Sequence, residues 1–264
     1  MNASLKDLAR KALRKFNVGI TTYTNLQLLN GLSSGVGSEI ELLLKLKLTD
    51  EDPSRLPGIM RNSKSQFRQD LFVAGELGCK RDGYFVEFGA TNGIDLSNTY
   101  LLEKEFGWNG ILAEPAKRWH EELRKNRNSH IETDCVWSNT SSVLSFNEAD
   151  SGELSTIASF SSSDNYREER RHGTSYSVKT ISLEDLLDKY SAPKEIDYLS
   201  IDTEGSEYEI LRNFNFDKYR IKVITCEHNF TSAREKIFSL LKRNGYIRKF
   251  PEFSRVDDWY VRAD

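Results

Sequence analysis

The amino-acid sequence predicts an α/β fold, in which a mostly parallel β-sheet is covered by helices on both faces. From about residue 63, short apolar runs closed by turns alternate with segments of helical periodicity. The first run, 84–88, ends in a turn that contains two glycines, and an acidic residue, Glu114, closes the second run about 20 residues later. Such sheets bind ligands at the carboxyl ends of their strands, so we expect the chemistry of this chain there.

The length allows one large domain, or one domain with an appendage. The chain has 264 residues, of which 38% are hydrophobic, enough for a sizeable core. Lys and Arg total 37 against 40 Asp and Glu, so no global positive field exists and no nucleic-acid partner is expected. Cys79, Cys135 and Cys226 lack CxxC spacing, which argues against disulfides and thiolate zinc sites. Since neither a membrane-spanning run nor a secretory signal is visible, a cytoplasmic location is expected.

Residues 1–62 are expected to form a helical extension that precedes a domain at 63–264. Near the start, a stripe of apolar residues from Leu5 to Phe16 is flanked by Lys and Arg, as in a basic amphipathic helix. This helix could pack on its own domain or on a second subunit of a homodimer. Alternatively it could bind an anionic partner or a membrane surface, which would make any membrane contact peripheral. A second helix is expected over 40–48.

Within 63–264 the periodicity places the elements in a regular order. Strands are expected at 84–88, 111–113, 131–137, 196–201, 221–226, 246–250 and 259–261. Helices are expected at 96–106, 115–126, 183–190, 205–213 and 232–243. The Ser-rich stretch 148–177 has no clear periodicity. We expect it to be an insertion that covers the substrate, or a solvated surface excursion.

The turn after the first strand, which runs from Glu87 to Gly93, suggests what the site binds. Its glycines could let the backbone approach a ligand, although such turns also occur for packing reasons. The Glu87 carboxylate would repel a dinucleotide pyrophosphate and suit a ligand that carries a cation. Glu114 could accept both hydroxyls of a ribose, or it could cap the helix that Pro115 begins. Together these features point to S-adenosylmethionine.

Five ordered motifs carry a resemblance to a known family. They are SQFRQD at 65–70, FVEFGA at 85–90, SNTYLLE at 97–103, ILAEP at 111–115 and IDTEGSE at 201–207. Over residues 63–264 the chain resembles the FkbM family of S-adenosylmethionine-dependent methyltransferases. The resemblance implies a class I, Rossmann-like methyltransferase fold with a seven-stranded sheet whose last strand is antiparallel. It also implies O-methylation of a hydroxyl on a sugar, either nucleotide-linked or in a surface glycan, or on a natural product.

The resemblance assigns cofactor contacts residue by residue. It places four residues in the loop on the methionine side and Glu114 at the ribose; the four are Glu87, Gly89, Ala90 and Gly93. Three residues could bind the methionine carboxylate, or cap the next helix; they are Ser97, Asn98 and Thr99. Asp134 could accept a hydrogen bond from adenine beside Cys135. The resemblance suggests that Gln66 and Asp70 close over the cofactor, whereas sequence alone would leave them on the surface.

Two strand ends supply the catalytic candidates, Asp202 after the fourth strand and the run Glu227, His228 and Asn229 after the fifth. In one chemistry His228 is a general base that Asp202 orients. In another, Asp202 and Glu227, with His228 or Asn229, hold Mg²⁺ or Mn²⁺, which binds the acceptor oxygen. A third interpretation is a structural ion-pair cluster.

Two other functions compete with methylation, namely an NAD-dependent oxidoreductase or epimerase and a non-catalytic cofactor-binding module. The acceptor, a small molecule or a glycan, is not named by any motif. His172, beside Arg170 and Arg171, could meet a phosphate of a nucleotide-linked sugar, unless Glu168 and Glu169 neutralise the arginines.

Overall fold

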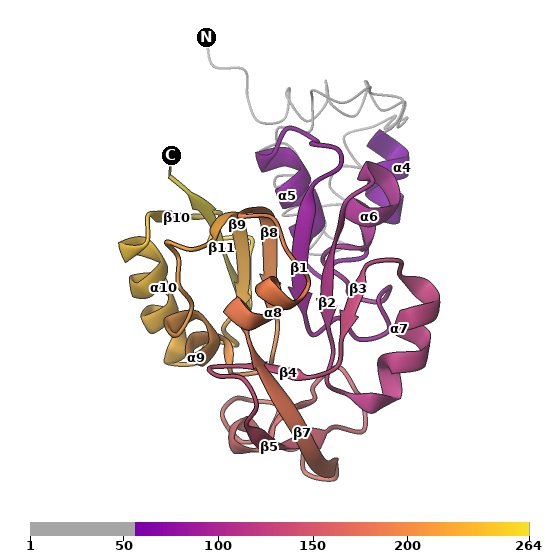
Figure 1. Ribbon diagram of the computed structural model, residues 1–264, viewed down its shortest axis with the longest axis vertical. Helices are drawn as coiled ribbons and strands as arrows, with labels where there is room; N and C mark the ends of the chain where they lie inside the picture. The colour runs from indigo at the N-terminus through magenta and orange to yellow at the C-terminus, as the bar shows by residue number, and fades with distance from the viewer. Residues whose placement is uncertain (1–55, 264) are drawn as a thin grey trace, which may run out of the picture.

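A seven-stranded sheet forms the centre of the molecule in the computed structural model, which describes residues 56–263 (Figure 1). The helices expected at the start of the chain and over 40–48 lie outside these residues. The sheet has the strand order β10-β11-β9-β8-β1-β2-β3. Its strands are β1 (Tyr84–Phe88), β2 (Asn109–Ala113), β3 (His130–Glu132), β8 (Glu195–Ile201), β9 (Arg220–Glu227), β10 (Tyr246–Lys249) and β11 (Asp257–Arg262).

The sheet is parallel except for its last strand. β11 pairs antiparallel with both β9 and β10, whereas β1, β2, β3, β8 and β9 pair in parallel. This arrangement confirms the predicted fold class. It brings the carboxyl ends of β1, β2, β8 and β9 to one edge of the sheet, where ligand sites of such folds lie.

Helices cover both faces because strand side chains alternate in direction. Val86 and Phe88 pack with α8 (Leu183–Lys189), α9 (Glu207–Arg212) and α10 (Ala233–Arg243). Phe85, between them in sequence, packs on the opposite face. The helices on that face are α4 (Leu56–Asn62), α5 (Gln69–Glu76), α6 (Tyr100–Phe106) and α7 (His120–Asn126), the last preceded by a 3-10 turn, η2 (Lys117–Trp119). None of the helices in 56–263 is sufficiently long and apolar for a membrane span.

A second, four-stranded sheet corrects two predictions. Its strands are β4 (Cys135–Trp137), β5 (Val143–Glu148), β6 (Thr156–Ile157) and β7 (Thr174–Ser182), in the order β4-β7-β5-β6, with a 3-10 turn, η3 (Ala158–Phe160), after β6. The expected strand 131–137 is therefore two strands in two sheets, divided at Thr133 and Asp134. The expected insertion 148–177 begins and ends in strands of this sheet. β7 was missed because its first half, Thr174 to Ser177, is polar and largely exposed.

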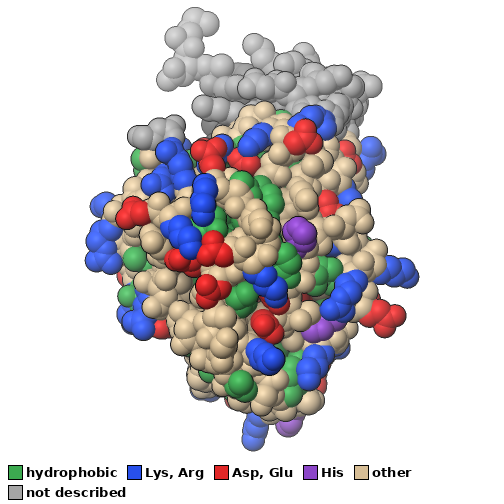
Figure 2. Space-filling model, in the orientation of Figure 1, with side chains coloured by type: hydrophobic (Ala, Val, Ile, Leu, Met, Phe, Trp, Pro, Cys, Tyr) green, Lys and Arg blue, Asp and Glu red, His purple; other side chains and the backbone are tan. Residues whose placement is uncertain are grey.

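The small sheet lies below the carboxyl ends of the parallel strands in Figure 1, so it faces the edge where ligands bind. The small sheet has its own apolar cluster, which includes Ala116, Cys135, Phe146, Ile157 and Val178. On the face of the molecule shown in Figure 2, Lys and Arg side chains are interspersed with Asp and Glu, so neither sign of charge dominates that face.

Candidate active site

A cavity lies at the carboxyl ends of β1, β2, β8 and β9. Glu87 and Phe88 line it from β1, Ala113 and Glu114 from the end of β2, and Asp202 and Glu227 from the ends of β8 and β9. The small sheet and the 148–177 segment supply the opposite wall, with Cys135, Leu154, Ser155, Ile157 and Tyr166 among its residues. The segment expected to cover the substrate therefore does face the cavity.

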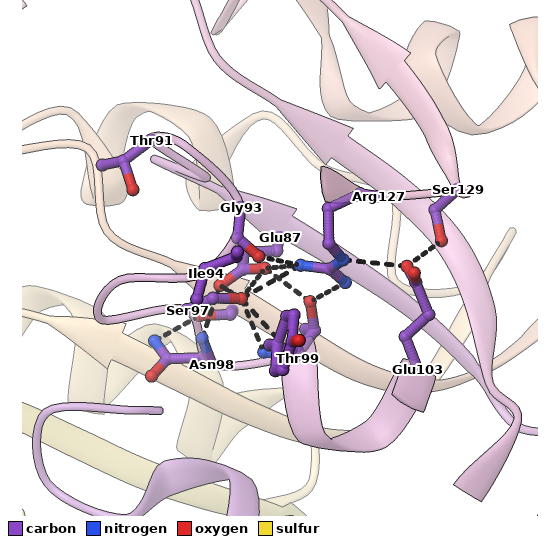
Figure 3. A network of polar contacts seen from close by, with 12 residues as sticks. Glu87, Thr91, Gly93, Ile94, Ser97, Asn98, Thr99, Glu103, Arg127 and Ser129 are labelled. Carbon is purple, nitrogen blue, oxygen red and sulfur yellow. Dashed lines mark hydrogen bonds and ion pairs between the residues drawn. The ribbon is translucent and has the colours of Figure 1, made fainter. Parts of the chain in front are cut away.

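Glu87 is buried at the end of β1, and its carboxylate is already fully engaged (Figure 3). Its oxygens accept hydrogen bonds from Ser97 Oγ at 3.0 and 3.2 Å, from the Asn98 N–H at 2.6 Å and from Thr99 Oγ1 at 2.5 Å. Burial raises the pKa of Glu87, while the positive charge of Arg127 opposes that rise. Residues 97–99 bind this carboxylate from an irregular, bent stretch of backbone, and α6 therefore begins at Tyr100 instead of residue 96.

Arg127 is the counter-ion of Glu87 and was not predicted. Its side chain is completely buried, and its guanidinium lies 3.7 Å from Glu87 Oε2. Its nitrogens donate to Glu103 at 2.9 Å, to the Gly93 carbonyl and Ser97 Oγ at 3.1 Å, and to Thr99 Oγ1 at 2.9 Å. The cation that Glu87 was expected to take from a ligand is thus supplied by the protein. A buried carboxylate requires such a partner, but the sequence did not indicate which basic residue would reach it.

The glycines of the first turn serve packing inside the protein. A Cβ on Gly89, whose φ is +74°, would lie 2.1 Å from the Asp202 carbonyl oxygen. A Cβ on Gly93, whose φ is +80°, would lie 2.6 Å from the Arg127 side chain. Both positions need a glycine for the left-handed conformation and for a close neighbour. Of the two, only Gly89 lines the cavity; Ala90 is buried beside it and does not.

Asn98 is the residue of the 97–99 group that faces the cavity. The hydroxyls of Ser97 and Thr99 are taken by Glu87 and Arg127, and Ser97 Oγ also accepts from the Tyr100 N–H, which caps α6. Asn98 lines the cavity, donates to Ser200 Oγ at 2.9 Å, and has a buried Oδ1 with no hydrogen-bond partner. A buried acceptor without a partner is costly, so it marks a place where a ligand donor would fit.

Glu114 occupies the position expected of a ribose-binding carboxylate. One oxygen accepts from the Thr91 N–H at 2.8 Å and the other from the Ala116 N–H at 2.7 Å, so the carboxylate is held by both neighbouring turns. Each oxygen keeps a lone pair for a further donor. Burial raises the pKa of Glu114 to about 7, against the two backbone hydrogen bonds.

The other expected cofactor contacts divide between the cavity and the protein interior. Cys135 and Gln66 line the cavity, whereas Asp134 does not. Asp70 is fully buried, where it accepts hydrogen bonds from Ser63 Oγ at 2.7 Å and Ser65 Oγ at 2.5 Å. It fastens the start of α5 and is neither a surface residue nor a lid over the cavity.

Three carboxylates from two strand ends meet on the far side of the cavity. Asp202, Glu204 and Glu227, here called the carboxylate cluster, each place an oxygen within 4.8 Å of the others. Burial and the negative charge of Glu207 raise the pKa of Asp202 to about 7, although a hydrogen bond with Glu227 opposes the rise. Burial and the charge of Asp202 raise the pKa of Glu204 to about 9, and burial also raises that of Glu227. Glu227 Oε2 is buried and has no hydrogen-bond partner.

His228 does not join this cluster, because neighbouring residues at the end of β9 point to opposite sides. Its Nδ1 accepts from the Phe230 N–H at 3.0 Å, and its Nε2 lies 3.8 Å from Asp258 Oδ1. It is absent from the cavity wall, and burial lowers its pKa. Glu204, not His228, completes the set of potential metal ligands among residues 56–263. Asn229 lines the cavity and donates to Glu204 Oε2 at 3.1 Å.

Arg170 fastens the 148–177 segment over the carboxylate cluster. Its buried guanidinium donates to Glu204 Oε2 at 2.5 Å and to Asp164 Oδ1 at 2.7 Å. Arg167 and Arg171 both pair with Glu168, at 3.5 and 3.6 Å. Arg170 is therefore neutralised by Glu204 and Asp164, and not by Glu168 or Glu169 as the sequence suggested, whereas Arg167 and Arg171 are exposed and share one carboxylate.

No curated protein matches the sequence. Among solved structures, the chain is similar to precorrin-6y C5,15-methyltransferase from Geobacter metallireducens, with a TM-score of 0.36 and 12% identity over 73% of this chain and 84% of that one. It is also similar to the methyltransferase domain of METTL16, with a TM-score of 0.34 and 13% identity over 80% of this chain and 82% of that one.

The family model described as the methyltransferase FkbM domain matches residues 87–259, which include the last two residues of β1, the strands β2, β8 and β9, and the whole carboxylate cluster. The sheet order with its antiparallel β11 is that of the class I, Rossmann-like methyltransferases. Since the match spans more than half of the 264 residues, the protein belongs to the FkbM methyltransferase family.

Proposed function

We propose that this methyltransferase uses S-adenosylmethionine to methylate a hydroxyl of a sugar or a natural product. The observation that carries the proposal is that one cavity joins Glu114 and Asn98 on one side to the carboxylate cluster on the other. Glu114 and Asn98 offer hydrogen-bond acceptors for a nucleoside and an amino acid, and the carboxylate cluster offers groups that can receive a proton.

The residues on the donor side fit S-adenosylmethionine. Glu114 is held by the Thr91 and Ala116 N–H groups and keeps lone pairs for the two ribose hydroxyls. The unpartnered Asn98 Oδ1 fits the ammonium of the methionine moiety. When bound, S-adenosylmethionine supplies a methyl group on a cationic sulfur. Glu87, which Arg127 neutralises, supports this site by positioning residues 97–99.

On the acceptor side, Asp202 is the group that we assign to receive the hydroxyl proton. A general base works best when its pKa lies near the working pH, and that of Asp202 is raised to about 7. Glu227 lies beside it, with a carboxylate oxygen within 4.8 Å of one on Asp202. His228, the base first expected, lies behind the cavity wall.

The same carboxylates offer a second chemistry. Asp202, Glu204 and Glu227 are hard oxygen ligands that could hold Mg²⁺ or Mn²⁺, although Arg170 and Asn229 already occupy Glu204 Oε2. Assays with EDTA and with added Mg²⁺ separate the two chemistries. Activity that survives EDTA assigns Asp202 as a base, and activity restored only by Mg²⁺ assigns the cluster to a metal.

Calorimetry with S-adenosylhomocysteine tests the proposed donor directly. We expect saturable binding that weakens about 10- to 100-fold in Glu114→Gln, because a hydrogen bond to a charged group contributes about 1.5–3 kcal/mol. Glu121→Gln, an exposed change on α7, is the matched control and should leave the affinity unchanged. Binding of NAD without S-adenosylhomocysteine would instead favour an oxidoreductase.

A further inference from the structure

The charged side chains of the cavity wall are all acidic. Its described lining contains seven carboxylic side chains and no Lys, Arg or His; the seven are Glu87, Asp95, Glu114, Glu153, Asp202, Glu204 and Glu227. Two of them have buried counter-ions inside the protein, since Arg127 faces Glu87 and Arg170 faces Glu204. The remaining carboxylates have no basic partner in the wall, so the cavity favours cationic contents.

Glu227 supplies an unsatisfied oxygen to the cavity wall. It is 7% exposed, and its Oε2 has no hydrogen-bond partner. Asp202 lines the same wall and places a carboxylate oxygen within 4.8 Å of one on Glu227. When ionised, both carboxylates only accept hydrogen bonds, so a cation that binds between them must donate them.

An aromatic ring completes this end of the cavity. Tyr166, from the 148–177 segment, lines the cavity, and its ring centroid lies 5.9 Å from the guanidinium carbon of Arg170, which donates to Glu204. Burial, together with the charges of Glu204 and Glu227, raises the pKa of the Tyr166 hydroxyl. An aromatic face beside carboxylates is a typical environment for an ammonium group, because the ring and the carboxylates both attract the cation.

A phosphate is poorly matched to the same place. It would enter beside Asp202 and Glu227 without a basic side chain in the described wall to receive it. The nearby arginines do not help, because Arg170 is buried against Glu204 and Asp164, and neither Arg167 nor Arg171 lines the cavity. A nucleotide-linked sugar would have to place its diphosphate among carboxylates.

We propose that the acceptor carries a protonated amine, which binds between Tyr166, Asp202 and Glu227, and has no phosphate inside the cavity. An amino sugar or an amino alcohol has this chemistry. The inference rests on the methyltransferase function proposed above and specifies its substrate class. The ammonium neutralises Glu227 and orients the neighbouring hydroxyl toward Asp202.

Calorimetry on the full chain saturated with S-adenosylhomocysteine tests the inference. The probes are glucosamine and ethanolamine, the neutral analogue glucose, and inorganic pyrophosphate and Mg²⁺. We expect at least one amine to bind saturably, at least 10-fold more tightly than glucose, with no binding of pyrophosphate. Its affinity should fall at least 10-fold in both Glu227→Gln and Tyr166→Leu and stay unchanged in Glu121→Gln.

The controls separate the two proposals. Failure of S-adenosylhomocysteine to bind the unmodified chain would remove the proposed function itself. Three other results, each with S-adenosylhomocysteine still bound, would overturn only the amine inference. They are that neither amine binds, that glucose or pyrophosphate binds as tightly as the amines, or that Mg²⁺ binds the carboxylate cluster in place of the amines. Melting temperatures and S-adenosylhomocysteine affinities of Glu227→Gln and Tyr166→Leu, both expected near those of the unmodified chain, show that a lost amine signal is local.

Discussion

Arg127→Met tests whether the ion pair beneath the first turn holds the donor side of the site together. Methionine keeps an unbranched side chain against Phe85, whose ring centroid lies 5.5 Å from the guanidinium carbon. The change removes the charge that faces Glu87 and the donors to Glu103, Ser97 and Thr99. It therefore leaves a buried carboxylate without its counter-ion.

The magnitude follows from the burial of both partners, whose side chains are 0% and 3% exposed. Removing one partner of such a pair costs about 3–5 kcal/mol of the free energy of unfolding. For a domain of this size each kcal/mol lowers the melting temperature by about 2–4 °C, so we expect a fall of roughly 6–20 °C. Arg124→Met, an exposed change on α7, the helix that ends just before Arg127, should stay within about 0.5 kcal/mol of the unmodified chain.

A double-mutant cycle shows whether the loss comes from Glu87. The double variant Glu87→Gln, Arg127→Met has no buried carboxylate charge left unpaired. Its loss of unfolding free energy should therefore be smaller than the sum of the losses of the two single variants, with a coupling free energy of about 2 kcal/mol. Urea unfolding of the four proteins measures it. Equal losses for Arg127→Met and Arg124→Met, or additive losses in the cycle, would refute this reasoning.

The pH dependence gives an independent check on the same pair. The pKa of Glu87 is already raised by burial, and loss of Arg127 removes the charge that opposes the rise. A protein that contains an acid with a higher pKa in the folded state binds more protons when it is folded. The free energy of unfolding of that protein therefore falls as the pH rises through the folded-state pKa. The deficit of Arg127→Met should therefore be smaller at pH 5 than at pH 8, in parallel urea titrations.

Three further outcomes are expected. Gly89→Ala should lose about 2–5 kcal/mol of unfolding free energy in urea titrations, from its left-handed φ and its clash with Asp202, whereas Gly78→Ala, with positive φ but open space, should lose about 1–2 kcal/mol. In initial-rate assays, activity should rise with pH through about 7 as Asp202 ionises, and this rise should disappear in Asp202→Asn. A pH-dependent rise that persists in Asp202→Asn, or that disappears in His228→Asn, would contradict the assignment of Asp202 as the base. Since the pKa values of Asp202 and Glu204 are raised to about 7 and about 9, the native state holds extra protons, and melting temperatures of the ligand-free protein should fall between pH 6 and pH 9; a rise would contradict this.

The seven strands of the main sheet could be predicted because their side chains are apolar and sit between turns. β1, β8 and β9 lie within one residue of their expected bounds. The small sheet could not be predicted in the same way, since β7 begins with the polar residues Thr174 to Ser177 and makes its pairs with β5 and β4 over long sequence separations. Periodicity reports which faces are buried and carries no signal for a polar strand.

For the site, the sequence identified the strand ends but not the directions of the side chains. Glu114, Asp202 and Glu227 face the cavity as the spacing indicated, whereas the neighbouring His228 turns toward Asp258. Arg127 was missed because its role depends on tertiary proximity to Glu87, from which it is separated by 40 residues in sequence. The cofactor contacts implied by the family resemblance remain predictions until a ligand is bound.

The division of the chain at Thr133 and Asp134 has a consequence for how such enzymes diversify. Glu114, which we propose as the ribose contact, follows β2, while β4 and the 148–177 segment belong to the small sheet. Under the proposed function, exchange of the excursion between β5 and β7 would remodel the acceptor wall and leave Glu114 in place. Libraries or chimeras confined to residues 149–173 should redirect selectivity while preserving donor use.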